Sequence, residues 1–361
     1  MRIALLGTRG IPASYGGFET FAEELSTRLA ARGHQITVYC RERSSGKSYR
    51  GVDLVWLPTI RHKYLDTMVH TSLSTLWLLF RRCDVALYCN AANAIFTILP
   101  RARGIPVALN VDGIERRRRK WNRAAKAWYL MSEYLATIFP NRMVADAHVI
   151  QTYYLERYAK ESTFIAYGAE HSFEPGQTAL DALGLEPQRY FLYVSRFEPE
   201  NHPLEVRRAF ELLSTDFKLA LVGDAPHAQE YICQVRNTRD PRIVIPGAIY
   251  GTGYRELSSH CFAYIQATEV GGTHPALIEN MGRGALVLYR NTPENAEVCG
   301  DAGLPFEEEI GLLAVMRRAL EMPEEERNEY RRRARERVQQ RYDWEVVTTE
   351  YERLFESLLY S

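Results

Sequence analysis

Residues 269–279 carry the sequence Glu269-Val270-Gly271-Gly272-Thr273-His274-Pro275-Ala276-Leu277-Ile278-Glu279, which has the pattern of a strand end, a two-glycine turn and a helix start. Thr273 or His274 can cap the helix, and Pro275 fits its first turn. The apolar run 276–278 begins the buried side of that helix. A strand that leads into a helix in this way is the repeating element of a doubly wound α/β fold.

The same segment is suited to bind phosphate. Gly271 and Gly272 let backbone N–H groups come close to a ligand, and the helix start adds donors and the positive end of the helix dipole. Glu279 follows one helical turn later, a rise of about 5.4 Å, so its carboxylate could hold the ribose of a nucleotide whose diphosphate lies at the glycines. An ordinary strand, turn and helix with an exposed Glu279 is the alternative that this segment alone leaves open.

Strand and helix patterns alternate along the rest of the chain. The first half has short apolar strands at 3–6, 36–40, 53–57, 84–88 and 107–110, and a helix that ends near Gly33. The second half has strands at 190–194, 219–222, 243–245, 263–267 and 286–289. We therefore predict an α/β fold of two Rossmann-like doubly wound domains that face each other across a cleft, with ligands at the carboxyl ends of the strands.

The length of the chain agrees with two domains. A chain of 361 residues suggests domains of roughly 150–200 residues each. Residues 167–175 interrupt the pattern, so we expect domains at 1–170 and 171–342. The last segment, 343–361, is predicted to form a helix that packs back toward the N-terminal domain, with an apolar face of Val347, Tyr351, Leu354, Phe355 and Leu358.

Composition favours a cytoplasmic protein. Apolar residues make up 46% and charged residues 25% of the chain, as in ordinary globular proteins. The six scattered cysteines have no Cys-x-x-Cys pair and are expected to be buried thiols. No signal peptide or membrane-spanning segment is expected. Residues 1–170 hold 24 Lys and Arg against 14 Asp and Glu, which indicates that the first half meets something anionic.

Three further segments carry candidate site residues. The glycines from Gly7 to Gly17 have the wrong spacing for a dinucleotide fingerprint, so Gly16 and Gly17 are interpreted as a flexible loop over a substrate. Arg196 leaves a strand end and could bind a diphosphate with two hydrogen bonds, or pair with a nearby glutamate. Asp112 also follows a strand end, where it could hold sugar hydroxyls or act on an acceptor, or only shape a turn.

A basic run follows Asp112 and has two interpretations. Its members are Arg117, Arg118, Arg119, Lys120 and Trp121. They could form a solvated helix, or contact anionic lipid head groups or a lipid diphosphate with help from aromatic rings. Nucleic acid is disfavoured because no recognisable binding motif accompanies the run.

Metal-dependent chemistry is not predicted. The sequence has no Asp-x-Asp, no His/Cys cluster with metal-ligand spacing, and no Walker or Gly-x-Ser-x-Gly motif. We therefore expect no metal and no cofactor, which leaves metal-independent diphosphate chemistry.

Taken in order, these pieces resemble the retaining family-4 glycosyltransferases of the GT-B fold over nearly the full length of the chain. Within that family the resemblance is to the bacterial polysaccharide rhamnosyltransferase branch. The motifs that carry it are Thr8-Arg9-Gly10-Ile11-Pro12, Tyr15-Gly16-Gly17-Phe18-Glu19-Thr20, Asn110-Val111-Asp112-Gly113, Arg196-Phe197-x-Pro199-Glu200-Asn201, Glu269-Val270-Gly271-Gly272-Thr273 with Pro275 and Glu279, and Asn295-x-Glu297-Val298.

The resemblance implies roles for individual residues. It implies an N-terminal acceptor domain and a C-terminal nucleotide-sugar domain, with Arg196 and Asp112 as the catalytic candidates. The implied donor-binding residues are Gly16, Gly17, Asn201, Gly271, Gly272, Thr273, His274 and Glu279. The implied acceptor or sugar contacts are Glu19, Asn110 and Glu269.

Two departures from the broad family point to one branch. The family usually has a Lys five residues after the Arg, where this chain has Asn201, and a Glu eight residues before the ribose Glu, where this chain has Gly271. The branch with this Asn and this Gly-Gly-Thr is associated with dTDP-rhamnose. The resemblance therefore implies transfer of L-rhamnose to a lipid-linked or oligosaccharide acceptor in surface polysaccharide synthesis, by a cytoplasmic or peripheral membrane enzyme. Transferases of UDP- or GDP-sugars, an epimerase of the same fold and an inactive scaffold subunit remain as alternatives.

Overall fold

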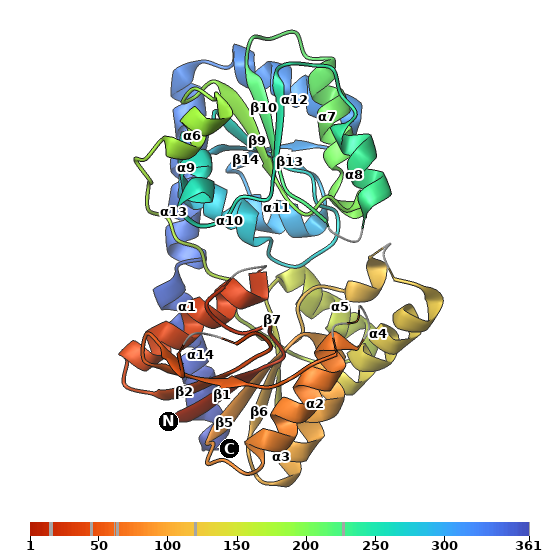
Figure 1. The fold of residues 1–361 in the computed structure, drawn as a ribbon, viewed down its shortest axis with the longest axis vertical. Coiled ribbons are helices and arrows are strands. Elements are labelled where there is room, and N and C mark those ends of the chain that lie inside the picture. The colour runs from red at the N-terminus through yellow and green to blue at the C-terminus, as the bar shows by residue number, and fades with distance from the viewer. Residues whose placement is uncertain are drawn as a thin grey trace. The chain divides into compact units, whose positions relative to one another are not determined.

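We analysed a computed structural model of the chain, which describes residues 1–13, 17–43, 46–60, 62, 65–118, 121–225 and 228–360 (Figure 1). The chain forms two compact units. Unit 1 consists of Met1–Gly168 with Trp344–Ser361, and unit 2 of Ala169–Asp343. The chain therefore passes between the units twice, after Gly168 and after Asp343.

Unit 1 contains a sheet of eight described strands in the order β3-β4-β2-β1-β5-β6-β7-β8. All pairs are parallel except β3 with β4. The strands are β1 (Arg2–Leu6), β2 (Gln35–Cys40), β3 (Ser48–Tyr49), β4 (Val52–Trp56), β5 (Val85–Cys89), β6 (Val107–Asn110), β7 (Arg142–Ala145) and β8 (Thr163–Phe164). The central strands β1, β5 and β6 are almost entirely buried, as expected for parallel strands covered on both faces.

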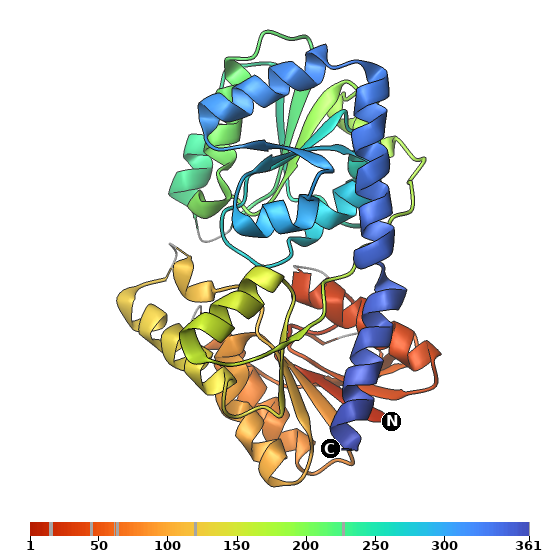
Figure 2. The same ribbon diagram turned by 180° about the vertical axis from the view of Figure 1, so that it is seen from behind.

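Helices cover both faces of this sheet (Figures 1 and 2). They are α1 (Gly17–Ala31), α2 (Asp66–Leu78), α3 (Ile98–Ala102), α4 (Arg123–Ala136), α5 (His148–Tyr158) and α14 (Trp344–Leu359), with 3₁₀ turns η1 (Ala91–Thr97) and η2 (Glu115–Arg117). One hydrophobic core joins alternate sheet residues to buried side chains of α2, η1, α4 and α5. Helices α1 and α14 pack together against the sheet.

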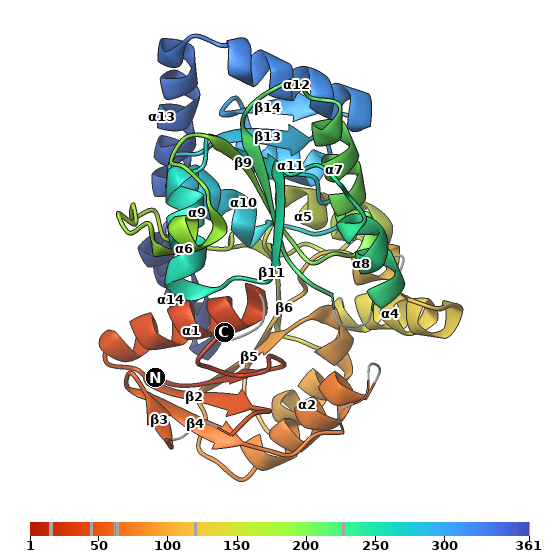
Figure 3. The same cartoon turned by 45° about the horizontal axis from the view of Figure 1, so that its top comes forward.

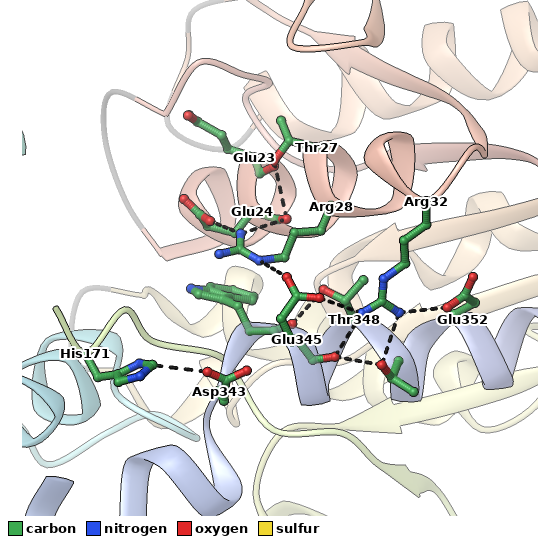
Figure 4. Close-up of polar contacts among 12 residues, drawn as sticks. Glu23, Glu24, Thr27, Arg28, Arg32, His171, Asp343, Glu345, Thr348 and Glu352 are labelled. Atoms are coloured by element: carbon green, nitrogen blue, oxygen red, sulfur yellow. Dashed lines mark hydrogen bonds and ion pairs between the residues drawn. The ribbon is translucent and has the colours of Figure 1, made fainter.

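The last helix, α14, joins unit 1 through its apolar side. Trp344, Tyr351 and Phe355 are buried, and the Tyr351 ring lies 5.4 Å from Phe21 of α1. Ion pairs flank this contact, with Arg28 and Arg32 of α1 both bound to Glu345 (Figure 4). The second chain crossing is tightly packed, because a Cβ atom on Gly168 would lie 2.3 Å from the Trp344 ring.

Unit 2 contains a parallel sheet of six described strands in the order β11-β10-β9-β12-β13-β14. The strands are β9 (Tyr190–Val194), β10 (Lys218–Val222), β11 (Ile243–Gly247), β12 (Ala263–Gln266), β13 (Leu286–Arg290) and β14 (Gly303–Phe306). The helices are α6 (Thr178–Leu183), α7 (Pro203–Glu211), α8 (Gln229–Arg236), α9 (Gly251–His260), α10 (Pro275–Gly282), α11 (Pro293–Cys299), α12 (Glu309–Glu321) and α13 (Glu324–Arg341), with a 3₁₀ turn η3 (Pro199–Asn201). Figure 3 shows α7 and α8 on one side of this sheet and α9 and α10 on the other.

Both sheets reverse their strand order at one point. In unit 1 the order runs outward in opposite directions from β1 and β5, and in unit 2 from β9 and β12. At such a switch point the connections leave toward opposite faces, which opens a crevice beyond the carboxyl ends of the two strands.

The prediction of two doubly wound α/β sheets is confirmed. It overlooked β3, β7, β8 and β14, of which β3 and β8 have two residues each and β3, β8 and β14 form sheet edges. Within the described ranges, no helix is long and apolar enough to cross a bilayer.

Candidate functional site

The switch point of unit 2 brings together two predicted loops. The loop after β9 carries Arg196 and Asn201, and the loop after the adjacent strand β12 carries Glu269 and the start of α10. The two loops are joined directly, because the Glu269 N–H donates to the Glu200 carbonyl at 3.0 Å. The sequence motifs 196–201 and 269–279 therefore form one site in space.

Arg196 is an accessible cation at this site. Its side chain is 42% exposed, and its guanidinium lies 3.9 Å from the Glu198 carboxylate. An ion pair at that distance in partly exposed surroundings is weak, so the guanidinium is free to turn toward an anion. Gly223, at the end of β10, makes room for this loop, because a Cβ atom there would lie 1.8 Å from the Ser195 carbonyl.

Asn201, expected to contact a donor, lies beneath the loop. It is 2% exposed, and its amide nitrogen donates to the Arg196 carbonyl at 2.7 Å. Its own carbonyl accepts a hydrogen bond of 2.7 Å from the Tyr193 hydroxyl. Asn201 thus holds the backbone of Arg196 in place, which is a positioning contact.

The start of α10 is shaped by Gly271. A Cβ atom on Gly271 would lie 2.4 Å from the His274 ring, so any larger residue would require that ring to move. His274 occupies the N-cap position in an extended conformation, and Pro275 is the first helical residue. Thr273 is 7% exposed. The helix start therefore has the geometry that the sequence predicted, with a positive dipole end at the carboxyl edge of β12.

Glu279 lies one turn into α10 and is half-buried. It is adjacent to Tyr254 of α9, which also accepts a hydrogen bond of 3.2 Å from the Asn280 amide. Burial, with the Glu279 charge adding to it, raises the pKa of Tyr254 well above its usual range. The phenol therefore stays neutral and can orient the Glu279 carboxylate.

Glu269 is part of a chain of charged groups that sequence reasoning missed. Its carboxylate lies 3.1 Å from Nε2 of His202, whose Nδ1 lies 2.9 Å from Glu205. Arg290, at the end of β13, binds the other oxygen of Glu205 at 2.5 Å. Burial opposes ionisation of Glu205, but His202 and Arg290 outweigh it and lower the pKa of that carboxyl. No local sequence motif predicts this row of contacts, because its residues follow three different strands.

Asn295 is a second residue that the predicted site did not include. It is fully buried, and its amide nitrogen donates at 3.0 Å to the carbonyls of Thr268 and Arg290. It thereby ties the end of β12 to the end of β13, beneath the loop that carries Glu269. Its position in the motif 295–298 was the sequence feature that could have indicated this role.

In unit 1 the carboxyl end of β6 carries Asn110 and Asp112. Asn110 accepts a hydrogen bond of 3.0 Å from the Asp112 N–H, and its amide nitrogen donates to the Tyr351 hydroxyl at 2.9 Å. Asp112 has a φ of +60°, a left-handed conformation that Asp tolerates better than most residues. Asn110 and α14 together impose this turn.

Glu19 supports the loop after β1. It is 6% exposed and accepts a hydrogen bond of 3.0 Å from the Arg9 N–H. Burial raises the pKa of the Glu19 carboxyl. Next to it, at the end of β2, Arg41 binds Asp66 of α2 at 2.9 Å, and burial lowers the pKa of Arg41 despite this partner.

The remaining predicted residues fall in or near the undescribed stretches. Gly16, Arg119 and Lys120 lie outside the described residues. Gly17 begins α1 and accepts a hydrogen bond of 2.8 Å from the Tyr167 hydroxyl.

The described members of the basic run contact the protein itself. Arg118 lies 2.7 Å from Glu115, the Trp121 N–H donates to Glu115 at 2.9 Å, and Arg117 lies over the Tyr153 ring. Among the residues described, no group of His, Cys, Asp and Glu has the arrangement of a metal site.

The two parallel α/β sheets have the GT-B fold. The sucrose-phosphate synthase of Thermosynechococcus elongatus has a similar structure, with a TM-score of 0.79 at 18% identity over 99% of this chain and 98% of that one. HepE of Anabaena, in complex with UDP and glucose, gives a TM-score of 0.80 at 15% identity over 99% and 100% of the chains. WaaG, a glycosyltransferase involved in lipopolysaccharide biosynthesis, gives 0.75 at 14% identity over 99% and 99%.

Part of the chain also matches a known family by sequence. Residues 15–158 match the family model described as Glycosyltransferase Family 4. This segment spans α1 to α5 of unit 1 and covers less than half of the chain. No curated protein sequence matches the chain significantly.

Proposed function

We propose that the protein is a retaining glycosyltransferase that moves L-rhamnose from dTDP-rhamnose to a lipid-linked or oligosaccharide acceptor, in bacterial surface polysaccharide synthesis. One observation carries the proposal. Arg196 and the start of α10 follow adjacent strands at the switch point of unit 2, so an accessible cation and a helix N-terminus lie at the same sheet edge. Such an edge is suited to a nucleoside diphosphate. Asn201 and Gly271–Thr273, the branch-specific residues, support rhamnose as the sugar.

In this mechanism the bond between the sugar C1 and the diphosphate oxygen breaks while the acceptor hydroxyl attacks the same face of the sugar. The proton of that hydroxyl passes to the leaving diphosphate. Arg196, held by Asn201, stabilises the charge that develops on the leaving group, and Glu279 holds the ribose. Asp112 and Glu19 of unit 1 would serve the acceptor, Asp112 by contact and Glu19 by supporting the loop after β1. The reaction is proposed to need no metal ion.

A UDP-sugar is the second candidate donor. The observation that favours it is the similarity to HepE in complex with UDP-glucose. The TM-score between that structure and this chain is 0.78. Base recognition in this fold is largely by backbone, so Arg196 and Glu279 would act in the same way on either nucleotide.

The first experiment is a thermal-shift screen with dTDP, UDP and GDP and their sugars, with and without EDTA. We expect dTDP-rhamnose and dTDP to raise the melting temperature most, with no effect of EDTA. A larger shift with UDP would favour a UDP-sugar as the donor. No shift with any nucleotide would favour the alternative that the protein is an inactive scaffold subunit. Conversion of the donor without acceptor would indicate an epimerase.

The second experiment tests the role of Arg196. Arg196→Ala is expected to lower kcat by roughly 10²–10³-fold, because it removes one donor to the leaving group, and to weaken dTDP binding in calorimetry. Arg189→Ala is a matched control, since Arg189 is a surface arginine of unit 2 paired with Asp216. If Arg196→Ala behaved like this control, the diphosphate assignment would be wrong.

A further inference from the structure

The turn after β5 holds its first residue in an unfavourable backbone conformation. Asn90 has a φ of +74°, and Asp112, which follows the adjacent strand β6, has a φ of +60°. The left-handed region is disfavoured for residues with a side chain and persists only where the surrounding contacts impose it. Residues in such conformations cluster at functional sites, so these two strand ends mark a candidate subsite of unit 1.

The two turns are joined by backbone hydrogen bonds. The Asn90 N–H donates to the Asn110 carbonyl at 2.8 Å, and the Ala91 N–H donates to the Val111 carbonyl at 3.4 Å. Asp112 follows Val111 directly. Asn90 and Asp112 therefore lie at the same edge of the sheet, at the carboxyl ends of two neighbouring parallel strands.

The side-chain amide of Asn90 has a fixed orientation. Its Oδ1 accepts a hydrogen bond of 2.9 Å from the Ala92 N–H. Because a backbone N–H can only donate, this contact decides which end of the amide is the oxygen. Asn90 is half-buried, and its amide nitrogen has no hydrogen-bond partner among the residues that the structure describes. The amide nitrogen is therefore a positioned donor that a ligand can use.

The same turn contains a buried acceptor that the protein does not satisfy. Asn93 is fully buried, and its amide nitrogen donates to the Cys89 carbonyl at 2.7 Å. Its Oδ1 has no partner within the described part of the chain. Gly7 of the loop after β1 packs closely against this turn, because a Cβ atom there would lie 2.5 Å from the Cys89 carbonyl oxygen. An orphaned buried acceptor of this kind indicates a site for an ordered water or a ligand group.

Two carboxylates lie near the end of β5. Burial, with the charges of Glu19 and Asp112 adding to it, raises the pKa of the Cys89 thiol, so both carboxylates are close to that residue. Glu19 is buried, whereas Asp112 is half-buried. A carboxylate has about four acceptor positions, so Asp112 can accept from a ligand hydroxyl in addition to the contacts that it already makes.

We propose that Asn90 and Asp112 form a subsite for two adjacent hydroxyls of the acceptor sugar. One hydroxyl accepts a hydrogen bond from the Asn90 amide nitrogen, and its neighbour donates to the Asp112 carboxylate. Neighbouring strands lie about 4.8 Å apart, a separation that two adjacent hydroxyls can bridge with one hydrogen bond to each side. An anionic group fits poorly, because the Asp112 charge repels it. The inference rests on the proposed function, since it names the chemistry of the acceptor, and it holds for any donor nucleotide.

Saturation-transfer NMR of the full chain with simple glycosides tests the proposal. The probes are the methyl glycopyranosides of glucose, mannose and galactose and the 3-deoxy analogue of each, measured with and without dTDP. A 3-deoxy analogue has no two adjacent hydroxyls. We expect at least one parent glycoside to bind, and its 3-deoxy analogue to bind at least about tenfold more weakly, because the two hydrogen bonds can no longer form together.

Asn90→Asp separates ligand contact from support of the turn. Aspartate keeps the oxygen that accepts from Ala92 and tolerates the left-handed backbone, but it lacks the amide N–H. We expect it to weaken binding of the preferred glycoside about tenfold and to leave dTDP affinity unchanged. Asn122→Asp is the matched control, since Asn122 is also a residue of unit 1 whose side chain accepts from a backbone N–H, that of Ala125 at 2.9 Å. It should bind the glycoside as the wild type does.

Asn90→Gly removes the same donor without adding a charge. Glycine adopts a positive φ readily, so the melting temperature of this variant should be no lower than that of the wild type. Glycoside binding should nevertheless be weakened as in Asn90→Asp. A residue with a merely structural role would not combine undiminished stability with loss of the ligand.

Three results would overturn the proposal. The first is that the wild type binds none of the glycosides. The second is equal affinity for a parent glycoside and its 3-deoxy analogue. The third is an unchanged glycoside affinity in either Asn90 variant. Glycoside binding that depends on Asn90, in a protein that does not bind dTDP, would support the subsite and contradict the proposed donor, so the two proposals can fail separately.

Discussion

Buried asparagines position the candidate groups in both units. Asn201 donates to the Arg196 carbonyl, and Asn110 accepts from the Asp112 N–H. In each case the short amide side chain satisfies a backbone group of the loop that would otherwise bond to water. Such contacts hold the backbone of a candidate site residue in place. Asn201 therefore acts on the backbone of Arg196 through its side-chain amide.

His70 of α2 is the buried titratable residue whose behaviour is easiest to measure. It is fully buried, and burial together with the nearby Arg41 lowers its pKa to about 4, although Asp66 acts in the opposite direction. The unfolded chain binds a proton at His70 below pH of about 6.5. Stability should therefore be complete above that pH and decrease as the pH falls toward 4, by up to about 3 kcal/mol.

The measurement is urea unfolding of the wild type and His70→Gln between pH 4 and pH 7. The difference between their unfolding free energies isolates His70, because the carboxylates titrate in both proteins. Thr71→Ser is the matched control, since Thr71 is a buried neighbour of His70 in α2 that does not titrate, and it should give a flat difference. A flat difference for His70→Gln as well would mean that the folded protein admits the proton.

At the scale of elements, α14 connects the chain end to the Asp112 turn. Its ion pairs with α1, such as Arg32–Glu352 at 2.7 Å, are partly exposed and each contributes about 1 kcal/mol or less. The buried hydrogen bond between Tyr351 and Asn110 is the more consequential contact, because it links α14 to the end of β6.

Tyr351→Phe tests this link. The change leaves the Asn110 amide nitrogen without its buried partner, which should cost about 1–3 kcal/mol of unfolding free energy. It should also lower kcat, because Asn110 shapes the turn of Asp112, while dTDP affinity in calorimetry stays unchanged. Tyr190→Phe is the control, since it removes a buried hydroxyl of unit 2 that donates to Leu257 at 2.6 Å. If the variant lost stability but kept full kcat, the contact of Tyr351 with Asn110 would support the fold and not catalysis.

At the scale of the whole molecule, unit 1 is built from both ends of the chain. Truncation after Asp343 removes the buried side chains of α14, which are Trp344, Val347, Tyr351, Leu354, Phe355 and Leu358. Burial of each contributes about 1.5–3 kcal/mol, and the total approaches the roughly 5–15 kcal/mol stability of a whole domain. We expect unit 1 of the truncated chain not to fold and unit 2 to remain folded.

Limited proteolysis followed by mass spectrometry measures this outcome. The truncated chain should be cleaved throughout 1–168, and a fragment within 169–343 should resist and still bind dTDP. Removal of Tyr360 and Ser361 alone is the control, because Tyr360 is 89% exposed, and it should change nothing. Resistance of 1–168 to cleavage would show that unit 1 folds without α14.

Features that depend on neighbouring residues were predicted from the sequence, whereas contacts between distant segments were not. The strands β9, β12 and β13 were predicted because parallel strands covered on both faces require continuous apolar runs. The strands β3, β7, β8 and β14 were missed because strands of two to four residues leave little pattern. The start of α10 was predicted because capping and glycine geometry depend on neighbouring residues. His202, Glu205 and Arg290 were missed because only the sheet brings their loops together.

The sequence by itself therefore determined the α/β alternation, the two doubly wound sheets and the strand, turn and helix start of 269–279, since each depends on local periodicity and turn chemistry. Only the tertiary structure decided which side of a helix faces the core. In α2 and α4 the structure buries polar residues such as Thr71 and Ser132 and leaves Trp77 and Tyr134 exposed, which the periodicity of the two helices does not decide. It also decided that Asn201 points beneath its loop, because that direction depends on Tyr193 and the neighbouring strand.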